Sequence, residues 1–258
     1  MPPRNRLSAK PHWPKGVARH ILETTDSTNA HALRLAPTLS GPAWFVALEQ
    51  SAGRGRRARP WSSPRGNFHG TLVLRPTEAA GVVALRSFAA ALALRDALSG
   101  LTGFDSALTL KWPNDVLLNG GKVAGILLES MAAGAGVSHL AIGIGVNLIA
   151  APDQSLLEAG SLPAVTVLEE TGLRVTPEAF VDLLAPAYAH WEDVFVTQGF
   201  APLRQEWLTH AARLGEVIRA RTGATSREGR FETVDATGAL ILGMADGLVA
   251  IPAAEVFF

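Results

Sequence analysis

Apolar and polar residues alternate in short blocks along most of this chain, and the blocks predict both strands and helices. Short apolar runs bounded by polar or glycine-containing turns are typical of buried strands, and they occur at 43–49, 71–76, 107–112, 116–118, 122–130 and 139–148. Longer apolar segments predict helices packed on a sheet at 79–99, 176–198 and 200–211, and a polar cap at Asp26 begins a further helix. Asn119-Gly120-Gly121 is a hairpin-turn signal between two of the strands.

The pattern changes at about residue 213. From there to the last residue, short alternating segments are broken by glycine and aspartate, which is typical of a small all-β module that closes into a barrel. We therefore expect an α+β fold in which a mixed sheet is packed with helices. The expected divisions are an N-terminal lead-in at 1–19, a main domain at 20–211 and a small β-barrel at 212–258.

The composition is that of a folded globular protein. Of the 258 residues, 48% are hydrophobic and 18% are charged, and no apolar run is long enough for a transmembrane helix. The formal net charge is zero, which argues against a globally basic nucleic-acid-binding protein. The absence of cysteine excludes disulfides, thiol catalysis and cysteine-ligated metals. Because no signal peptide is recognisable near Met1, we expect a cytoplasmic protein that does not bind membranes.

A basic loop is expected at 50–70. Six arginines and no acidic residue lie between Gln50 and Thr77, and four of them fall within six positions: Arg54, Arg56, Arg57 and Arg59. Close guanidinium groups repel one another and the interleaved glycines loosen the backbone, so we expect the loop to order when an anion arrives. Arginine suits bidentate contacts with phosphate and carboxylate groups. A solvated basic loop or an RNA-contacting surface would explain the loop alone equally well.

Two lysines mark a second segment. Only four of the 23 basic residues are lysines, and two of these, Lys111 and Lys122, flank Pro113-Asn114-Asp115 and the hairpin that follows. Lys111 ends one predicted strand and Lys122 begins another, so we expect their ammonium groups to converge at one edge of the sheet. Asp115 could then approach a metal-bound phosphate. A plain β-meander with lysines that reach into solvent is the simpler alternative.

Two shorter segments are compatible with a ligand site or with ordinary structure. Asp26-Ser27-Thr28-Asn29 is first of all an N-cap signal, although its hydroxyl and amide groups could also bind a neutral polar ligand. The glycines of Gly143-Ile144-Gly145-Val146-Asn147 would allow a flat ring or another backbone to approach the end of a strand. A β-bulge would explain the same glycines.

Several common nucleotide and catalytic motifs are absent from the sequence. It has no Gly-x-x-x-x-Gly-Lys-Ser/Thr phosphate loop, no Gly-x-Gly-x-x-Gly after a strand, no Gly-x-Ser-x-Gly elbow and no His-x-x-x-His pair. The seven histidines are scattered and suggest no metal site. A nucleotide enzyme with this sequence would need a phosphate site of another design.

Taken together and in this order, the segments resemble those of the biotin protein ligases. The resemblance rests on Ser27-Thr28-Asn29, on Gln50 with Gly-Arg-Gly-Arg-Arg at 53–57 and Trp61, on Lys-Trp-Pro-Asn-Asp at 111–115 with Lys122-x-x-Gly125-Ile-Leu-x-Glu129, and on Gly-Ile-Gly-Val-Asn at 143–147. It covers about residues 20–258. The combination is specific, whereas no single motif would be.

The resemblance implies a class II synthetase-like catalytic domain followed by a small C-terminal SH3-like β-barrel. It implies a two-step reaction in which biotin and Mg-ATP form biotinyl-5′-AMP and pyrophosphate, and the biotinyl group then passes to one lysine of a biotin carboxyl carrier protein of acetyl-CoA carboxylase. ATP and Mg²⁺ are the implied cofactors, and the carrier domain is the implied partner. Family members often pair through the central sheet, so a homodimer is expected.

The resemblance also assigns roles to individual residues. Lys122 and Arg56 would be catalytic. Biotin would be bound by Ser27, Thr28, Asn29, Gln50, Gly53, Arg54, Gly55, Arg56, Lys122 and Gly125. ATP would be bound by Arg57, Arg59, Trp61, Lys111, Asn114, Asp115 and Asn147, and Mg²⁺ would lie near Asp115 without a direct ligand assigned.

The chemistry of such a reaction agrees with these residue types. A carboxylate that attacks an α-phosphate brings two anions together, and cationic side chains offset their repulsion in the transition state. The product is a mixed anhydride that water would destroy, so a loop that closes over the ligand would protect it.

Two features depart from the family pattern. The arginine loop usually has glycine where this chain has Ala58, and if that position needs a positive φ, alanine would cost about 1 kcal/mol and weaken ordering of the loop. Many bacterial members carry an N-terminal DNA-binding domain, whereas only a short segment precedes Ser27 here. We therefore expect a ligase without operator binding and with no DNA partner.

Two other functions remain as alternatives. A lipoate ligase or octanoyltransferase has a related fold and also acylates a carrier lysine, but the arginine loop and the C-terminal β module favour biotin. A nucleic-acid-binding module built on the arginines at 54–59 would leave Lys111, Lys122 and the neutral net charge unexplained.

Overall fold

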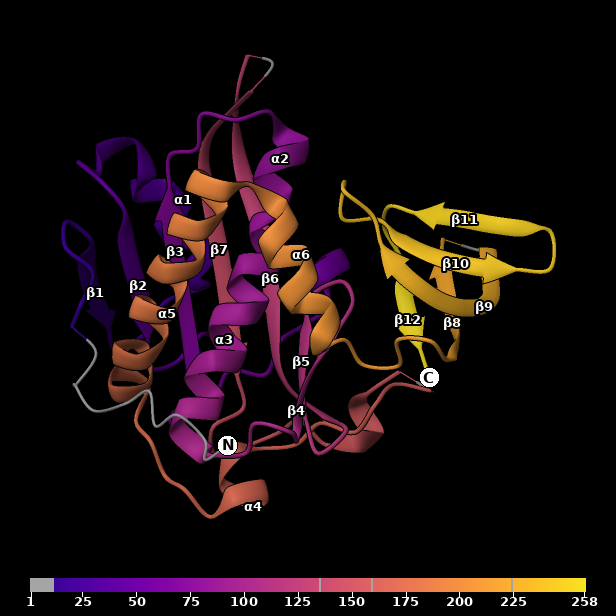
Figure 1. Cartoon of the computed structure of the whole chain (residues 1–258). Helices are drawn as coiled ribbons and strands as arrows, with labels where there is room; N and C mark the ends of the chain where they lie inside the picture. Colours follow the sequence, from indigo (N-terminus) through magenta and orange to yellow (C-terminus); the bar gives the residue numbers. More distant parts are fainter. Residues whose placement is uncertain (1–11, 135, 159, 224) are drawn as a thin grey trace, which may run out of the picture.

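A mixed sheet of seven strands forms the centre of the protein (Figure 1). The structure is a computed structural model and describes residues 12–134, 136–158, 160–223 and 225–258. The sheet has the order β1-β2-β3-β7-β6-β5-β4, with β1 parallel to β2 and the other neighbours antiparallel. Its strands are β1 (Ala18–Leu22), β2 (Ala43–Ala47), β3 (Phe68–Leu74), β4 (Leu108–Lys111), β5 (Asp115–Leu118), β6 (Gly121–Ala133) and β7 (Gly136–Val146). The predicted α+β fold with a mixed sheet is confirmed.

Helices cover the two faces of this sheet unequally. Three helices form a layer on one face: α3 (Arg86–Thr102), α5 (Pro177–Gln198) and α6 (Phe200–Thr209) (Figure 1). The short helix α1 (Thr28–Leu35) packs on the other face, against β2, β3, β6 and β7. The segment predicted as one helix at 79–99 forms two, because the chain turns at Leu85 between α2 (Ala80–Ala84) and α3. Sequence patterning did not predict β1 or the five-residue helix α4 (Val167–Thr171).

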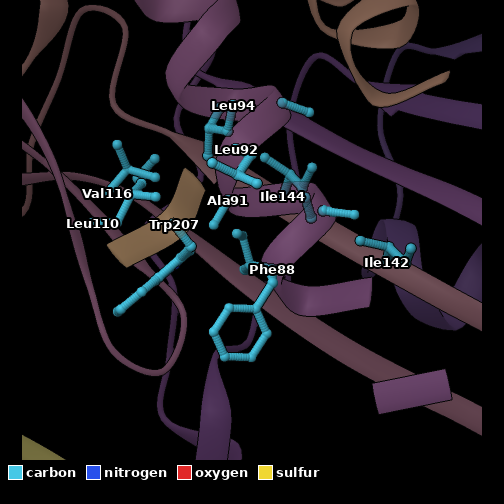
Figure 2. Close-up of a cluster of buried hydrophobic side chains, with 14 of the residues drawn as sticks. Phe88, Ala91, Leu92, Leu94, Leu110, Val116, Ile142, Ile144 and Trp207 are labelled. Carbon is cyan, nitrogen blue, oxygen red and sulfur yellow. The ribbon is translucent and has the colours of Figure 1, made fainter. Parts of the chain in front are cut away.

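Side-chain alternation along each strand explains why the two faces differ. On β7, Ile142 and Ile144 point into the helical layer, and Figure 2 shows them in one apolar cluster with Phe88 of α3. The residues between and after them, Gly143 and Gly145, point to the opposite face. The face under α3 is therefore filled by apolar side chains. The other face has a smaller apolar cluster that includes Phe45 under α1, and the glycines of β7 leave space beside it.

The last part of the chain forms a separate antiparallel sheet of five strands (Figure 1). Its order is β11-β10-β9-β8-β12, and its strands are β8 (Val217–Thr222), β9 (Thr225–Val234), β10 (Leu240–Met244), β11 (Gly247–Ile251) and β12 (Glu255–Phe257). This all-β module is consistent with the predicted SH3-like fold. It contacts the main domain, where the Trp112 indole N–H donates to the carbonyl of Gly238 at 3.0 Å.

The segment predicted as a lead-in is partly built into the fold. β1 begins at Ala18, so the expected boundary after residue 19 falls inside a strand. Trp13 packs against the core and its indole N–H donates to the carbonyl of Val17 at 2.7 Å. Residues 1–11 lie outside the described residues.

Candidate active site

A cavity of about 700 Å³ lies on the glycine-bearing face of the sheet. It is lined by residues from α1, β6, β7, the 50–67 loop, the segment 152–164 and the C-terminal strand β12. Every residue predicted for the site lines this cavity except Gly53. Gly53 packs directly behind it, since a Cβ there would lie 2.4 Å from the Ser63 hydroxyl and 2.7 Å from the Trp61 carbonyl.

A group of neutral polar residues forms one end of the cavity. Ser27 and Thr28 are buried at the start of α1, as predicted for an N-cap, but the Ser27 side chain makes no capping hydrogen bond. The carbonyl oxygen of the Gln50 side chain accepts hydrogen bonds from the Thr28 backbone N–H at 2.7 Å and from the Thr28 hydroxyl at 3.1 Å. The Gln50 amide N–H donates to Ser63 at 2.8 Å. These bonds hold the polar groups in fixed directions, which suits recognition of a small polar head group.

Asn29 lies at this end of the cavity, but its amide is used inside the protein. Its Nδ2 donates to Glu129 at 2.8 Å and to the Leu127 carbonyl at 3.3 Å, and its Oδ1 accepts from the Thr71 hydroxyl at 2.6 Å. It also fills the space above Gly143, where a Cβ would lie 2.3 Å from Oδ1. Both N–H groups therefore have partners, so Asn29 fits a role in holding the site together better than the predicted direct bond to ligand.

The two lysines converge, as expected, but they meet on the buried carboxylate of Asp115, which the sequence placed only near a metal-bound phosphate. Lys122 Nζ lies 2.7 Å from Asp115 Oδ1, and Lys111 Nζ lies 3.7 Å from Oδ2. Burial favours a raised pKa for Asp115, but the two ammonium groups outweigh it, and the pKa is lowered. Burial lowers the pKa of Lys111, against the attraction of Asp115. The two lysines and Asp115 together carry one net positive charge at the cavity.

Trp61 covers the glycine-bearing strands. A Cβ on Gly145 would lie 2.5 Å from the indole, and a Cβ on Gly125 would lie 3.3 Å from it, so the glycines allow a flat ring to approach the sheet. Lys122 Nζ lies 5.5 Å from the ring centroid. The buried indole N–H has no hydrogen-bond partner among the described residues, and it is a donor that a bound ligand could satisfy.

The arginine loop forms a tight hairpin over the cavity. The Gly55 N–H donates to the Arg59 carbonyl at 2.8 Å, and Arg54 forms an isolated antiparallel bridge with Pro60. Arg57 and Ala58 both have positive φ, at 56° and 57°. Position 58 therefore does need a positive φ, the backbone conformation that glycine adopts most easily and that alanine adopts at a cost.

The acidic partners of these arginines come from distant parts of the sequence. Arg57 pairs with Glu255 at 2.8 Å, and Arg59 pairs with Glu158 at 2.8 Å and also with Glu255. Hydrogen bonds from arginines outweigh the burial of Glu255 and lower its pKa. The loop thus has counterions that the local sequence lacks. No local pattern points to Glu158 or Glu255, since both are ordinary surface-type residues within their own segments.

Arg56 and the two asparagines connect the hairpin to the strands. Arg56 donates to the Asn114 side-chain oxygen at 3.5 Å and to the Ala254 carbonyl at 3.3 Å, and its burial lowers its pKa. Asn114 Nδ2 donates to the Ile126 carbonyl at 2.5 Å. Asn147 is buried and donates to the Val165 carbonyl at 3.2 Å. Both asparagines line the cavity while they tie its walls to the sheet.

The C-terminal residues were not predicted as part of the site. Phe257 and Phe258 line the cavity, and Lys111 Nζ lies 5.6 Å from the Phe258 ring centroid. The described residues contain no group of three or more histidine, cysteine, aspartate or glutamate residues that could hold a metal ion. Within the same residues, no helix has the length and apolar character needed to cross a membrane.

Known proteins are similar to this chain in both sequence and fold. Residues 21–147 match the Biotin/lipoate A/B protein ligase family, and residues 214–258 match the Biotin protein ligase C terminal domain. The chain is 60% identical over 238 residues to a biotin–[acetyl-CoA-carboxylase] ligase of Paracoccus denitrificans, covering 92% of this chain and 99% of that protein. It is 30% identical to the bifunctional ligase/repressor BirA of Bacillus subtilis, covering 93% of this chain and 73% of that protein.

Solved structures agree with this relationship. The biotin protein ligase of Aquifex aeolicus in complex with biotin and ATP superposes with a TM-score of 0.79 at 24% identity, covering 93% of this chain and 97% of that chain. The ligase of Leishmania major in complex with biotin gives a TM-score of 0.65 at 25% identity, covering 93% and 99%. The cavity, its predicted residues and both family matches lead to one conclusion: this chain belongs to the biotin protein ligases.

Proposed function

We propose that this protein is a biotin–[acetyl-CoA-carboxylase] ligase. It activates biotin with ATP to biotinyl-5′-AMP and transfers the biotinyl group to a specific lysine of the biotin carboxyl carrier protein, forming an amide bond. The observation that carries the proposal is the convergence of Lys122, Asp115 and the arginine hairpin on one cavity whose far end is lined by Ser27, Thr28 and Gln50. Polar recognition at one end and positive charge at the other suit a ligand with a neutral head group and a carboxylate.

Binding of biotin is assigned to the neutral end of the cavity. The Ser27 and Thr28 hydroxyls and the Gln50 amide would contact the ureido ring, and Asn29 would hold them in place. Gly125 leaves space for the ring, and Gly53, Arg54 and Gly55 shape the loop that closes over it. Because both N–H groups of Asn29 have protein partners, we assign Asn29 this supporting role and not a direct contact with biotin.

Lys122 and Arg56 are assigned to the chemical step. Lys122 is held beside Asp115 and above Gly125, where it would lie between the biotin carboxylate and the α-phosphate. Arg56 is the most enclosed arginine of the hairpin, and its burial strengthens its interaction with a developing negative charge. The two side chains would reduce the repulsion between the reacting anions without any covalent step on the protein.

ATP is assigned to the charged end of the cavity. Arg57 and Arg59 would exchange their bonds to Glu158 and Glu255 for bonds to phosphate oxygens. Lys111, Asn114 and Asn147 would line the nucleotide pocket, and Trp61 would cover it. Bound phosphate would replace the carboxylates as partners of Arg57 and Arg59, while Arg221 would still pair with Glu158 and Glu255.

We place the Mg²⁺ site near Asp115, a carboxylate that lines the cavity. A magnesium ion bound with ATP needs one or two carboxylates, because phosphate oxygens and waters complete its shell. Asp115 is buried, ionised and lines the cavity, so its chemistry fits such an ion. The ion would neutralise phosphate charge when bound.

The proposed function also bears on the location of the protein, on DNA binding and on its oligomeric state. We propose that the ligase is cytoplasmic, where ATP and the carrier protein occur. It would not bind operator DNA, because Arg54, Arg57 and Arg59 face carboxylates and the cavity. We also propose a homodimer through the sheet edge at β1, whose only neighbour among the described strands is β2.

Mass spectrometry tests the main proposal. The purified chain is incubated with ATP, Mg²⁺, biotin and an unmodified carrier domain, and parallel reactions omit ATP or replace biotin with lipoate. The expected result is a gain of one biotin on one carrier lysine, dependent on ATP. Modification with lipoate and not with biotin would support the lipoate alternative instead. The match of residues 214–258 to the biotin ligase C-terminal domain favours biotin.

A further inference from the structure

A chain of hydrogen bonds and one ion pair crosses the floor of the cavity and ends on the arginine loop. Thr71 on β3 donates to Asn29 on α1, and Asn29 donates to Glu129 on β6 at 2.8 Å. The second carboxylate oxygen of Glu129 accepts from Arg54 Nη2 at 3.0 Å. Four parts of the protein that are far apart in sequence are connected in this way.

The inner half of this row of hydrogen bonds is buried, and its polar groups are paired. Thr71 is fully buried and Asn29 is 3% exposed, and both N–H groups of Asn29 have protein partners. Glu129 follows Gly125 and Leu127 on the cavity face of β6. Its carboxylate fixes the Asn29 amide with nitrogen toward β6 and oxygen toward Thr71, because a carboxylate can only accept.

The outer half controls the base of the loop hairpin. Arg54 is the first residue of the hairpin and bridges Pro60 at its other side. The next backbone bond joins Trp61 N–H to the Gly53 carbonyl at 2.9 Å, which closes the base. The arginines farther out, Arg57 and Arg59, pair with Glu158 and Glu255, which are outside the seven-stranded sheet. Among the ion pairs that the described residues make with the hairpin, only that of Arg54 with Glu129 reaches the seven-stranded sheet.

We propose that Glu129 is a positioning residue that latches the closed arginine hairpin to the floor of the biotin site. It does not contact the reacting atoms, but acts through Arg54 and Asn29. The proposal rests on the proposed ligase function and adds a determinant of loop closure to it. Because one carboxylate joins the loop and the floor, an occupied and ordered floor favours a closed loop, and an open loop loosens Asn29.

The latch predicts a particular split of kinetic effects. Loss of the charge should weaken retention of biotin and biotinyl-5′-AMP, because both need the loop closed. The chemical step in the closed state should change little, since Lys122 and Arg56 lie beside Asp115 and Asn114 and do not contact Glu129.

Glu129→Gln tests this directly, because glutamine has the same shape without the charge. We expect KM for biotin and the dissociation rate of biotinyl-5′-AMP to rise about 10-fold, with kcat for adenylate formation within 3-fold of the parent. Glu49→Gln is the matched control. Glu49 pairs with Arg65 of the same loop region at 3.3 Å, away from the cavity, and its loss should leave both values unchanged.

Limited trypsin digestion without ligand gives a readout that does not need ligase activity. Cleavage after Arg56, Arg57 and Arg59 should be several-fold faster in Glu129→Gln than in the parent or in Glu49→Gln. Faster cleavage in a protein that fails to ligate biotin would keep the latch and reject the proposed function. Parent-like cleavage in an active ligase would reject the latch alone.

A double-mutant cycle with Arg54→Gln separates the latch from a general packing defect. If Glu129 acts through Arg54, biotinyl-5′-AMP should dissociate from the double variant no faster than from the single variant that releases it faster. Multiplicative losses would overturn the proposal, and so would an unchanged KM for biotin in Glu129→Gln. If Glu129→Gln does not fold, Arg54→Gln alone must show the same faster cleavage, and its absence would also overturn the proposal.

Discussion

Ile144 and Gly145 are neighbours on β7, yet they face opposite sides of the sheet. Ile144 is 3% exposed within the apolar cluster beneath α3, and Gly145 is the residue against which the Trp61 indole packs. On the first face, a side chain contributes by filling volume. On the cavity face, glycines leave space over the strands, and Trp61 and charged side chains line that space. The same alternation thus builds the core and the site together.

The two faces should respond to mutation in different ways. Changes on the helical face should lower the free energy of unfolding and leave ligand affinity intact. Changes on the cavity face should alter catalysis or affinity at nearly constant stability. The predictions below test that separation, from the largest expected effect to the smallest.

Lys122→Ala should nearly abolish adenylate formation, by at least about 100-fold, because a cation facing the reacting anions is removed. The fold should persist, since Lys111 still faces Asp115 at 3.7 Å. Pyrophosphate release at saturating biotin and ATP measures the loss, and thermal unfolding checks the fold. Lys122→Arg should recover little activity, because a planar fork does not replace a compact ammonium. Parent-like release from Lys122→Ala would remove this residue from the mechanism.

Gly145→Ala should raise KM for biotin by about 10-fold, because the new Cβ would lie 2.5 Å from the Trp61 indole and displace it. The free energy of unfolding should change by less than about 1 kcal/mol, since alanine suits a strand at least as well as glycine. Equilibrium binding of biotin and urea denaturation measure the two quantities. Unchanged affinity would show that the position of Trp61 does not control the site.

Ile142→Ala, at a fully buried position on the same face of β7 as Ile144 and outside the cavity lining, should have the opposite profile. Removal of a buried side chain beneath α3 should lower the free energy of unfolding by about 2–4 kcal/mol. KM for biotin should remain that of the parent in the folded fraction. Urea denaturation and activity per folded molecule are the measurements, and a rise in KM as large as that of Gly145→Ala would contradict the separation of the faces.

His69 predicts how stability depends on pH. It lies opposite Gly145 in the β3–β7 pair, and burial lowers its pKa from 6.5 to about 4. The folded state therefore favours the neutral ring. The contribution of neutral His69 to the free energy of unfolding is complete above pH 6.5 and is lost as pH falls toward 4. The full loss corresponds to about 3 kcal/mol.

His69→Gln removes the titration and keeps an N–H donor for the Pro64 carbonyl, which lies 3.3 Å from the His69 ring nitrogen. Denaturation of both proteins between pH 7 and pH 4 isolates the contribution, because other acidic groups change equally. An identical pH dependence in the two proteins would show that His69 is protonated without cost.

Ala58→Gly should give the smallest effect. The φ of 57° at this position costs alanine about 1 kcal/mol relative to glycine in the ordered loop. Biotinyl-5′-AMP should therefore dissociate about 2- to 5-fold more slowly from the variant, which stopped-flow displacement can measure. Ala52→Gly is the control, because Ala52 lies in the same loop region without a positive φ, and faster dissociation from Ala58→Gly would show that the flexibility of glycine dominates.

Much of the site was predictable because its chemistry lies in short motifs. Lys111 ends β4 and Lys122 lies on β6, and both strands pair with β5, which carries Asp115, so their convergence follows from the local connectivity of one meander. The alternating glycines of β7, Gly143 and Gly145, likewise predict a face with room for a ring. The ends of β2 to β7 were predicted within three residues, because burial on a sheet leaves a pattern of apolar and polar positions along the chain, whereas β1 was not predicted.

The ionic partners of the loop were decided by tertiary structure alone. From the sequence, the arginines at 54–59 stood without counterions, and repulsion among them predicted a loop that awaits an anion. In the fold, Glu129, Glu158 and Glu255 supply those counterions from β6, a loop and the last strand. An ion pair depends on distance in space, and its partners leave no periodic or local pattern in the chain. Hydrophobic order along the sequence could therefore position the strands, whereas only their packing brings each acid to its arginine.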